Sequence, residues 1–406
     1  MTSSTNSFDV VVVGGGVIGL SIAWRVGQEG LRVALVDPDP GGGVSSIAAG
    51  MLGPTTTRSA YAEEELQNFN AISAAAYPAF SIELEEVSGM KVGYEHSGGI
   101  LVAVDAKAGE GPELSFPAAD GHRGDGVRFI ESVYKYQASL GLPVQMISSE
   151  QCRLLEPCIS PQATMAVLYE DEGHVDSRRL CQALVRACRA VEVNIHLHRV
   201  VHLITKGREA KGVLLDDGRQ LDAASIVLAA GAWSHLLNGL PEMVVQPLRP
   251  LKGQVVRVRS RMDAVYEVPS RTIRAHVNGR HVYVVPQLGG QAVVGATLED
   301  EGYDTSVTVE AVHRLLHDAS LVVPSIGGME VVNLGAGLRP VAADNVPMIG
   351  ASFVEGLFLA TGHGRNGVLL APATAEAVCK LITKGVVDES IRPFSPKRFY
   401  RETDGS

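Results

Sequence analysis

One short segment near the N-terminus restricts the possible folds of this chain more than any other. The apolar run 8–13 ends in Gly14–Gly19, whose letters GGGVIG have the spacing G-x-G-x-x-G, and Asp37 closes a second apolar run at 32–36. Glycines placed between a strand and a helix, with an acidic residue about 20 residues further on, form the fingerprint of a dinucleotide-binding βαβ unit. The segment therefore predicts a Rossmann-like α/β domain that binds an adenine dinucleotide.

Each position of this motif has a physical reason. Gly14 allows a sharp turn off the strand, Gly16 lets the backbone approach a pyrophosphate, and Gly19 lets the helix pack closely on the strand. The N-terminus of the helix offers unpaired N–H groups to the phosphates. We expect Asp37 to accept hydrogen bonds from a pair of ribose hydroxyls. A purely structural glycine turn is less favoured, because the strand–helix–strand unit around it has the right length.

The composition limits the class of partner. The chain has 406 residues, of which 46% are hydrophobic and 20% charged, enough for two or three domains with a large core. Its net charge of −10 argues against nucleic acid or an anionic membrane as the main partner. Residues 1–7 lack the features of a signal peptide, and no run of about 18 apolar residues occurs. We expect a cytoplasmic protein without a membrane span.

The cysteines and one loop segment give weaker indications. The five cysteines include no C-x-x-C pair, so we expect no metal site, and the cysteines should pack as small apolar residues. Residues 106–126 are rich in glycine, proline and acidic residues without periodicity, which is typical of a solvated surface excursion. A functional lid there is the less favoured alternative.

The rest of the chain contains two kinds of pattern. Helices are predicted at 63–87 and 177–190, and residues 357–361 and 368–383 resume a strand followed by a helix. In between, the alternation of apolar and polar residues at 254–259 predicts a half-exposed antiparallel sheet. Only one dinucleotide fingerprint is present, which points away from enzymes that pass electrons from NAD(P)H to bound FAD.

Four segments carry a family resemblance when they are taken together: Gly14–Gly19, Ser45–Leu52 (SSIAAGML), Gly337–Pro340 followed by Pro347–Gly350, and Gly362–Thr374 (GHGRNGVLLAPAT). They resemble the FAD-dependent amine oxidase family that includes D-amino acid oxidase and sarcosine oxidase, and within it most of all the glycine oxidases (ThiO) of thiamine biosynthesis. The first segment is generic, whereas the last two in this order are discriminating. The similarity covers residues 8–383, nearly the whole chain.

The resemblance implies two domains, both discontinuous in sequence. A Rossmann-like, glutathione-reductase-like FAD-binding domain would comprise residues 1–90, 160–244 and 333–406, and an antiparallel-sheet substrate-binding domain residues 91–159 and 245–332. The implied reaction is oxidative deamination of glycine and other small amines or D-amino acids. Flavin N5 accepts a hydride from the α-carbon, an imine forms, and O2 is reduced to H2O2. The cofactor performs the difficult step, so the protein mainly holds the α-carbon over the flavin.

The resemblance also implies roles for four side chains. Arg339, in GLRP, stands where the family places the arginine that binds the substrate carboxylate, a task suited to a planar guanidinium. Arg365, in GHGRNG, is expected to contact either substrate or flavin. Tyr283 matches a tyrosine that hydrogen-bonds the carboxylate or covers the site, and strand alternation places His281 on the same face. The structural alternatives are a surface ion pair for Arg339, an ordinary half-buried strand position for Tyr283 and a solvated position for His281.

The cofactor contacts implied by the resemblance come from four parts of the chain. Small residues at 45–51 would allow close approach of the isoalloxazine, and the backbone of Val200 would contact adenine. No cysteine lies near Arg339 or 45–51, and no histidine occurs in 45–51, so we expect non-covalent FAD. The expected contacts are Gly14, Gly16, Val17, Ile18, Gly19, Asp37, Pro38, Val44, Ser45, Ala49, Gly50, Met51, Val200, His363, Gly364, Arg365, Asn366, Gly367, Val368 and Leu369.

Some alternatives remain open from the sequence. Lys252 and Arg249 are expected to support the domain junction, with an oxygen-activating lysine as the less favoured role. The chain could instead be an FAD dehydrogenase that passes electrons to a quinone or carrier, or a nucleotide-binding regulatory protein. The expected partners are a small amino acid and O2. Relatives also imply a homo-oligomer and hand-over of the imine to a thiazole synthase.

Overall fold

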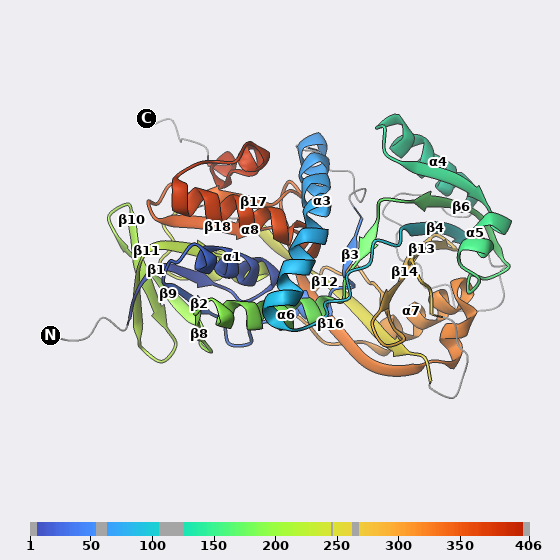
Figure 1. Ribbon diagram of the computed structural model, residues 1–406, viewed down its shortest axis with the longest axis horizontal. Helices are drawn as coiled ribbons and strands as arrows, with labels where there is room; N and C mark the ends of the chain where they lie inside the picture. The colour runs from blue at the N-terminus through green and yellow to red at the C-terminus, as the bar shows by residue number, and fades with distance from the viewer. Residues whose placement is uncertain (1–5, 54–62, 105–125, 245–246, 262–267, 401–406) are drawn as a thin grey trace.

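The computed structural model describes residues 6–53, 63–104, 126–244, 247–261 and 268–400, and Figure 1 shows its two large sheets side by side. Each of these sheets has eight strands, and a two-stranded sheet accompanies them. No helix among the described residues is both long and apolar enough to span a bilayer. Most of the excursion expected at 106–126 falls outside the described residues.

The first sheet has the order β17-β18-β11-β1-β2-β8, and the antiparallel strands β10 and β9 extend it beside β11. Its central strands β18, β11, β1, β2 and β8 are parallel, as a Rossmann-like unit requires. The strands are β1 Ser7–Val13, β2 Val33–Val36, β8 Asn194–His196, β9 Val200–Lys206, β10 Glu209–Leu215, β11 Gln220–Leu228, β17 Met348–Ala351 and β18 Leu357–Thr361.

Both faces of β1 are buried, which explains its unbroken run of valines. Val10 and Val12 face a core shared with the helices, whereas Val11 and Val13 face a second core under β9 and β10. The helices that form the first core are α1 Val17–Gln28, α3 Glu63–Ser88, α6 Ser177–Ala190 and α8 Gly367–Lys384. The expected helices at 63–87 and 177–190 are thereby confirmed.

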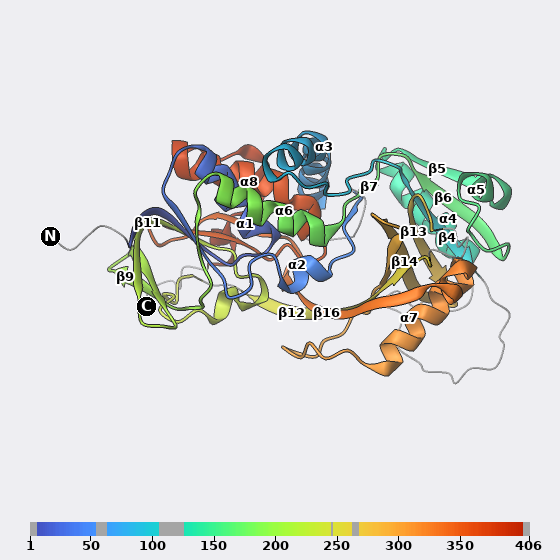
Figure 2. The ribbon, with the colours of Figure 1, turned by 60° about the horizontal axis from the view of Figure 1, so that its bottom comes forward.

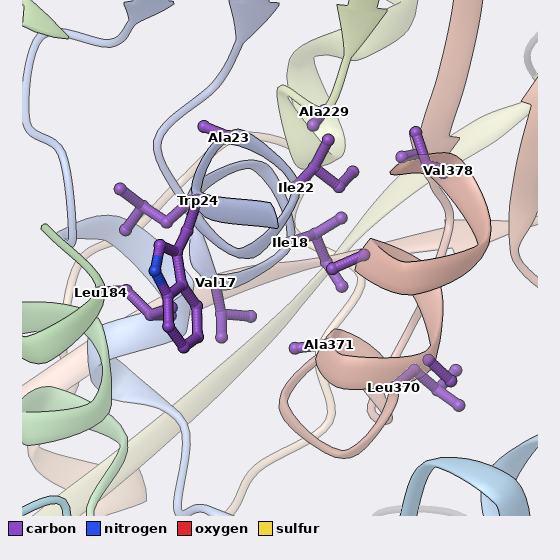
Figure 3. Close-up of a cluster of buried hydrophobic side chains, with 14 of the residues drawn as sticks. Val17, Ile18, Ile22, Ala23, Trp24, Leu184, Ala229, Leu370, Ala371 and Val378 are labelled. Carbon is purple, nitrogen blue, oxygen red and sulfur yellow. The ribbon is translucent and has the colours of Figure 1, made fainter. Parts of the chain in front are cut away.

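Helix α1 is the centre of this core. In Figure 3 its residues Ile18 and Ile22 point toward α8, which contributes Val378, whereas Trp24 lies beside Leu184 of α6. Trp24 is fully buried. The N-terminus of α1, which the glycine motif forms, is thus fixed by packing on two other helices.

The second sheet has the order β16-β12-β15-β14-β13-β4-β6-β5. Its strands are β4 Gly99–Val104, β5 Val144–Ser148, β6 Ala163–Tyr169, β12 Leu248–Arg259, β13 Thr272–Val277, β14 Arg280–Gln287, β15 Gln291–Gly295 and β16 Glu330–Ala342. The long pair β12–β16 runs from the first sheet to the second, as Figure 2 shows. The remaining elements are α2 Gly43–Ile47, α4 Gly126–Ser139, α5 Ser149–Leu155, α7 Val309–Val322, β3 Met51–Leu52, β7 Gly173–His174 and the 3₁₀ turns Gly231–Leu236, Pro324–Gly328, Glu389–Phe394 and Pro396–Phe399.

The sheet at 254–259 is antiparallel, as expected, but the expectation that it is half exposed is wrong. Residues 254–258 are all buried, including the polar side chains of Gln254 and Arg257. Apolar residues of this sheet pack under α7, and the polar ones find hydrogen-bond partners on other segments. The alternation therefore separates an apolar core from a buried polar layer and not from solvent.

The cysteines behave as small apolar residues. All five are free, and four of them are buried. Burial raises the pKa of the Cys181 and Cys188 thiols to about 12, so both stay protonated and unreactive. The domain boundaries given above remain a prediction, although β16 pairs along its whole length with β12 of the second sheet.

Candidate active site

A single large cavity with a volume of about 1510 Å³ is lined by residues of both eight-stranded sheets. Drug-sized ligands usually occupy roughly 300–1,000 Å³, so this cavity has room for more than one small molecule. Every site residue expected from the sequence lines it except Gly19. The structure therefore brings together residues as distant in sequence as Gly14 and Leu369.

One end of the cavity lies at the glycine motif. Gly14 has φ +108°, and a Cβ there would overlap the backbone of Ala229. A Cβ on Gly19 would overlap the Gly14 carbonyl, so Gly19 serves helix–strand packing and does not face the cavity. The Asp37 carboxylate accepts hydrogen bonds from the Gly15 N–H at 2.7 Å and from the Asp39 N–H at 2.7 Å. Those bonds fix its orientation at the cavity wall.

Two helix N-termini open into the cavity. Gly16 is the N-cap residue of α1 and Asn366 that of α8, and neither makes a side-chain capping hydrogen bond. The Val17 N–H donates to Ser45 Oγ at 2.9 Å. Uncapped helix N-termini carry N–H donors and a positive dipole end, which suit phosphates or a ring that gains negative charge. The residues present therefore fit a dinucleotide that extends from α1 to α8.

Segment 44–51 forms the cavity wall between these ends. Glycines on β16 allow it to pack closely, because a Cβ on Gly337 would lie 2.8 Å from Val44 and one on Gly335 2.7 Å from Ile47. These two glycines therefore make room for segment 44–47. The glycine that makes room for Arg339 is Gly253 of β12, where a Cβ would overlap the guanidinium.

The other end of the cavity gathers Arg339, Arg365 and Tyr283. Arg339 Nη1 donates to the carbonyl oxygens of Lys252 at 3.3 Å and Thr297 at 3.2 Å, which fixes its orientation. Burial raises the pKa of the Tyr283 hydroxyl, although the nearby arginines oppose the shift. Burial and the charge of Arg339 lower the pKa of Arg365. These three groups thus lie close enough to affect one another electrostatically.

This end carries positive charge without compensation. No salt bridge in the described part of the chain involves the guanidinium of Arg339 or of Arg365. Carboxylates line the cavity only at its opposite end, among the described residues, where Asp37 and Asp39 lie. Unpaired cations in a partly desolvated site are costly, which indicates a ligand that brings a negative charge.

His281 lines the cavity on the same strand as Tyr283 but has different neighbours. Its ring lies 5.2 Å from that of Phe129 and 5.1 Å from that of His276. Phe129 belongs to α4, which supplies a wall that our sequence interpretation missed. The amphipathic pattern of 126–139 was the available signal. Other lining residues that we missed, such as Arg274 and Trp233, lie in segments without a motif.

Two other basic residues lie away from the cavity. Lys252 is buried and pairs with Asp304 at 2.6 Å and Glu299 at 3.7 Å, and Arg249 pairs with Asp300 at 3.3 Å. Neither lines the cavity. Both lie on β12, and their expected role in supporting the domain junction remains a prediction.

His363 differs from the arginines beside it, because it carries no charge at neutral pH. It is buried, and burial lowers its pKa to about 3. Its Nε2 lies 3.2 Å from the Thr374 hydroxyl, so the loop before α8 is tied to the helix that follows. The neutral ring leaves the two arginines as the positive charges of this end.

This arrangement has counterparts among known proteins. The chain is 31% identical to the glycine oxidase of Geobacillus kaustophilus over 97% of this chain and 98% of that one. The crystal structure of that organism's glycine oxidase matches with a TM-score of 0.83 and covers 98% of this chain and all of that one. This similarity confirms the expected α/β fold with its two sheets.

A longer relative matches over part of its length. The bifunctional protein ThiO/ThiG of Trichormus variabilis is 28% identical over 97% of this chain, which spans only 55% of that protein. The family described as FAD dependent oxidoreductase (DAO) matches residues 9–381. The resemblance seen in the sequence is thus confirmed, and the cofactor of the family is FAD. The chain belongs to the DAO family of FAD-dependent oxidoreductases.

Proposed function

We propose that this chain is an FAD-dependent oxidase of glycine and other small amines or D-amino acids. The observation that carries the proposal is the pair of cavity-lining guanidinium groups, Arg339 and Arg365, without carboxylate partners in the described residues. A small amino acid supplies the missing carboxylate. In the balanced reaction the C–N single bond of the amine becomes a double bond, the amine loses two electrons and two protons, and O2 gains them as H2O2.

The proposed roles follow from the contacts of each group. Arg339 binds the carboxylate through two parallel hydrogen bonds, and its anchoring to two carbonyl groups holds that geometry before the substrate arrives. Arg365 contributes a second positive charge. Tyr283 stays protonated because its pKa is raised, so its hydroxyl donates a hydrogen bond to the carboxylate. His281 covers the side of the site toward α4.

The cofactor residues are part of the same proposal. The glycine motif and Asp37 would hold the adenosine diphosphate part, and segment 44–51 with the N-terminus of α8 would hold the ring, without a covalent bond. When bound, FAD supplies the acceptor for two electrons and the reactivity toward O2. Because the lining carboxylates among the described residues lie at the adenosine end, we assign no carboxylate base to the reaction.

The experiment measures H2O2 from the purified flavoprotein with glycine, sarcosine, D-alanine and D-proline. We expect peroxide with at least one of them and bleaching of the flavin spectrum when O2 is excluded. Bleaching without peroxide in air would favour a dehydrogenase that uses a quinone or carrier. If the flavoprotein shows neither bleaching nor peroxide with any of these compounds, the result contradicts amine oxidation and favours a regulatory nucleotide-binding protein.

The ThiO/ThiG relatives support a further part of the proposal, a thiazole synthase that receives the imine. We also propose a homo-oligomer, as the family resemblance implies. Gel filtration with light scattering, of the protein alone and mixed with a thiazole synthase, tests both. A monomer would contradict the proposed homo-oligomer. Unchanged elution of the mixture would contradict stable hand-over between the two proteins.

A further inference from the structure

Arg257 of β12 is a buried cation with an unusual set of partners. Its exposed fraction is 3%, and no salt bridge involves it in the described part of the chain. Its Nη2 donates to the carbonyl oxygens of Ser46 at 2.8 Å and Ala48 at 3.4 Å, and its Nε has no hydrogen-bond partner. Nη2 also lies 3.4 Å from Ser177 Oγ, so the end of the side chain is directed at segment 46–48 and at Ser177, on the outer side of the cavity wall.

Other donors hold the next carbonyl groups of this segment. Ser177 Oγ donates to the Ala48 carbonyl at 2.5 Å, Gln287 Nε2 to the Ala49 carbonyl at 3.1 Å, and the Val175 N–H to the Gly50 carbonyl at 2.9 Å. None of these donor residues lines the cavity. The carbonyl groups of 48–50 therefore all point away from the cavity.

This arrangement determines where the amide N–H groups point. In a trans peptide the N–H of one residue is directed opposite to the carbonyl of the residue before it. The N–H groups of Ala49 and Gly50 therefore face the cavity, which both residues line. No acceptor for either N–H exists among the described residues. The wall thus presents two donors to whatever occupies this part of the cavity.

The charge of Arg257 adds to the effect of these donors. Burial lowers its pKa to about 10, so it stays protonated at neutral pH. The electrostatic effect of Asp176 opposes that shift, but Asp176 makes no ion pair with Arg257. Burial of an unpaired cation costs stability, and the cost is understandable if the positive charge acts on a neighbouring group that becomes negative.

We propose that Arg257 is a positioning residue for the cofactor. It holds segment 46–48 so that the Ala49 and Gly50 N–H groups donate to the FAD ring, and its fixed positive charge favours the reduced ring. This proposal rests on the placement of FAD against segment 44–51 given above. It does not depend on the identity of the amine or of the electron acceptor.

The test compares Arg257→Met, Arg257→Lys and the control Arg259→Met in the full-length protein. Arg259 lies two residues further on the same strand, is partly exposed and pairs with Glu330 at 2.9 Å. The measurements are the dissociation constant of FAD from the reconstituted apoprotein and the midpoint potential of the bound flavin. Neither requires an amine or O2, so failure of the oxidase proposal would leave this test valid.

For Arg257→Met we expect FAD to bind about tenfold more weakly, or about 1.4 kcal/mol, the scale of one hydrogen bond from a charged donor. The midpoint potential should become more negative, an effect that a purely structural role would not produce. Arg257→Lys should restore the potential, because it keeps the charge. Wild-type affinity and potential in Arg257→Met, or equal changes in Arg259→Met, would overturn the proposal.

A second variant keeps the proposal testable if Arg257→Met does not fold. Gln287→Leu removes the donor to the Ala49 carbonyl and leaves the charge of Arg257 in place. We expect FAD to bind roughly threefold more weakly, as for one neutral hydrogen bond, with the potential unchanged. Unchanged FAD affinity in Gln287→Leu would contradict the role of the carbonyl contacts in aiming the N–H groups.

Discussion

The two ends of the cavity are assembled from the chain in different ways. The end at the glycine motif comes mainly from one continuous stretch, residues 13–39. The other end joins Arg339 of β16, Tyr283 of β14 and Arg365 of the loop before α8, with space provided by Gly253 of β12. A local motif supplies most of the first end, which Ala229 after β11 completes, whereas the second exists only after distant strands have paired.

The ends also differ in charge. Asp37 and Asp39 line the first, and the carboxylate of Asp37 already accepts two backbone hydrogen bonds. Arg339 and Arg365 line the second without an ion pair in the described residues. The first end is therefore complementary to hydroxyl groups and the second to a carboxylate. Substitutions at each end should separate cofactor binding from substrate binding.

The largest effect is expected from Gly14→Ala at the first end. The alanine must adopt φ +108°, and its Cβ would overlap the backbone of Ala229. We expect the loss of bound FAD and a decrease of about 3 kcal/mol in the free energy of unfolding. Flavin content and urea denaturation measure these changes. The control is Gly30→Ala, which has φ +81° but open space around its Cβ, so it should retain FAD.

At the second end, Arg339→Lys should weaken the binding of the substrate and leave the binding of FAD unchanged. A point charge replaces the planar fork, so the KM for the amino acid should rise about 10- to 100-fold, or about 1.4–2.8 kcal/mol. The flavin content should stay as in the wild type. Arg249→Lys, outside the cavity and paired with Asp300, is the matched control. An unchanged KM in Arg339→Lys would place the carboxylate elsewhere.

The contrast between the ends also explains what the sequence could predict. The glycine motif, Asp37 and the buried strand before them are contiguous, and their spacing alone specifies the turn and the helix N-terminus. The helix at 177–190 was predictable for the same reason, since Asp176 caps it locally. The arginines were found through family resemblance and through no pattern of their own.

Contacts that depend on strand pairing could not be predicted. Gly253 lies opposite Gly337 in the β12–β16 pair, yet it makes room for Arg339 two residues away. Arg257 has the sequence pattern of a solvated strand residue, because alternation cannot distinguish solvent from a buried polar layer. The amphipathic pattern of 126–139 indicates a helix, but the wall at Phe129 also depends on where α4 docks, which that pattern does not specify.

A smaller, pH-dependent effect is expected from His363 at the second end. Its pKa is lowered to about 3 in the folded state, against an ordinary value of about 6.5 when unfolded. The unfolded state therefore binds more protons between these values, and stability falls as the pH decreases through this window. Between pH 7.5 and 5 the loss should be about 2 kcal/mol from this residue.

The variant His363→Gln tests this linkage by urea denaturation at both pH values. The difference in unfolding free energy between pH 7.5 and 5 should shrink by about 2 kcal/mol, whatever the absolute stability of the variant. His174, with a pKa lowered to about 4 by burial, should retain its own part of the acid sensitivity. An undiminished difference would show that His363 takes up a proton in the folded protein.

The smallest effect concerns the size of the substrate. Tyr283 packs so closely that a Cβ on Gly295 would lie 2.6 Å from its hydroxyl, and it is partly buried against the cluster that contains Val255 and Ala49. Tyr283→Ala removes both the aromatic ring and the hydroxyl group from this end of the cavity. We expect kcat/KM for glycine to fall severalfold, which corresponds to the loss of about one hydrogen bond. The ratio of kcat/KM for D-alanine to that for glycine should rise. Because α1 and Asp37 are untouched, the flavin content should not change. An unaltered substrate ratio would move the small-substrate boundary away from Tyr283 and toward Arg365, whose loop would then determine substrate size.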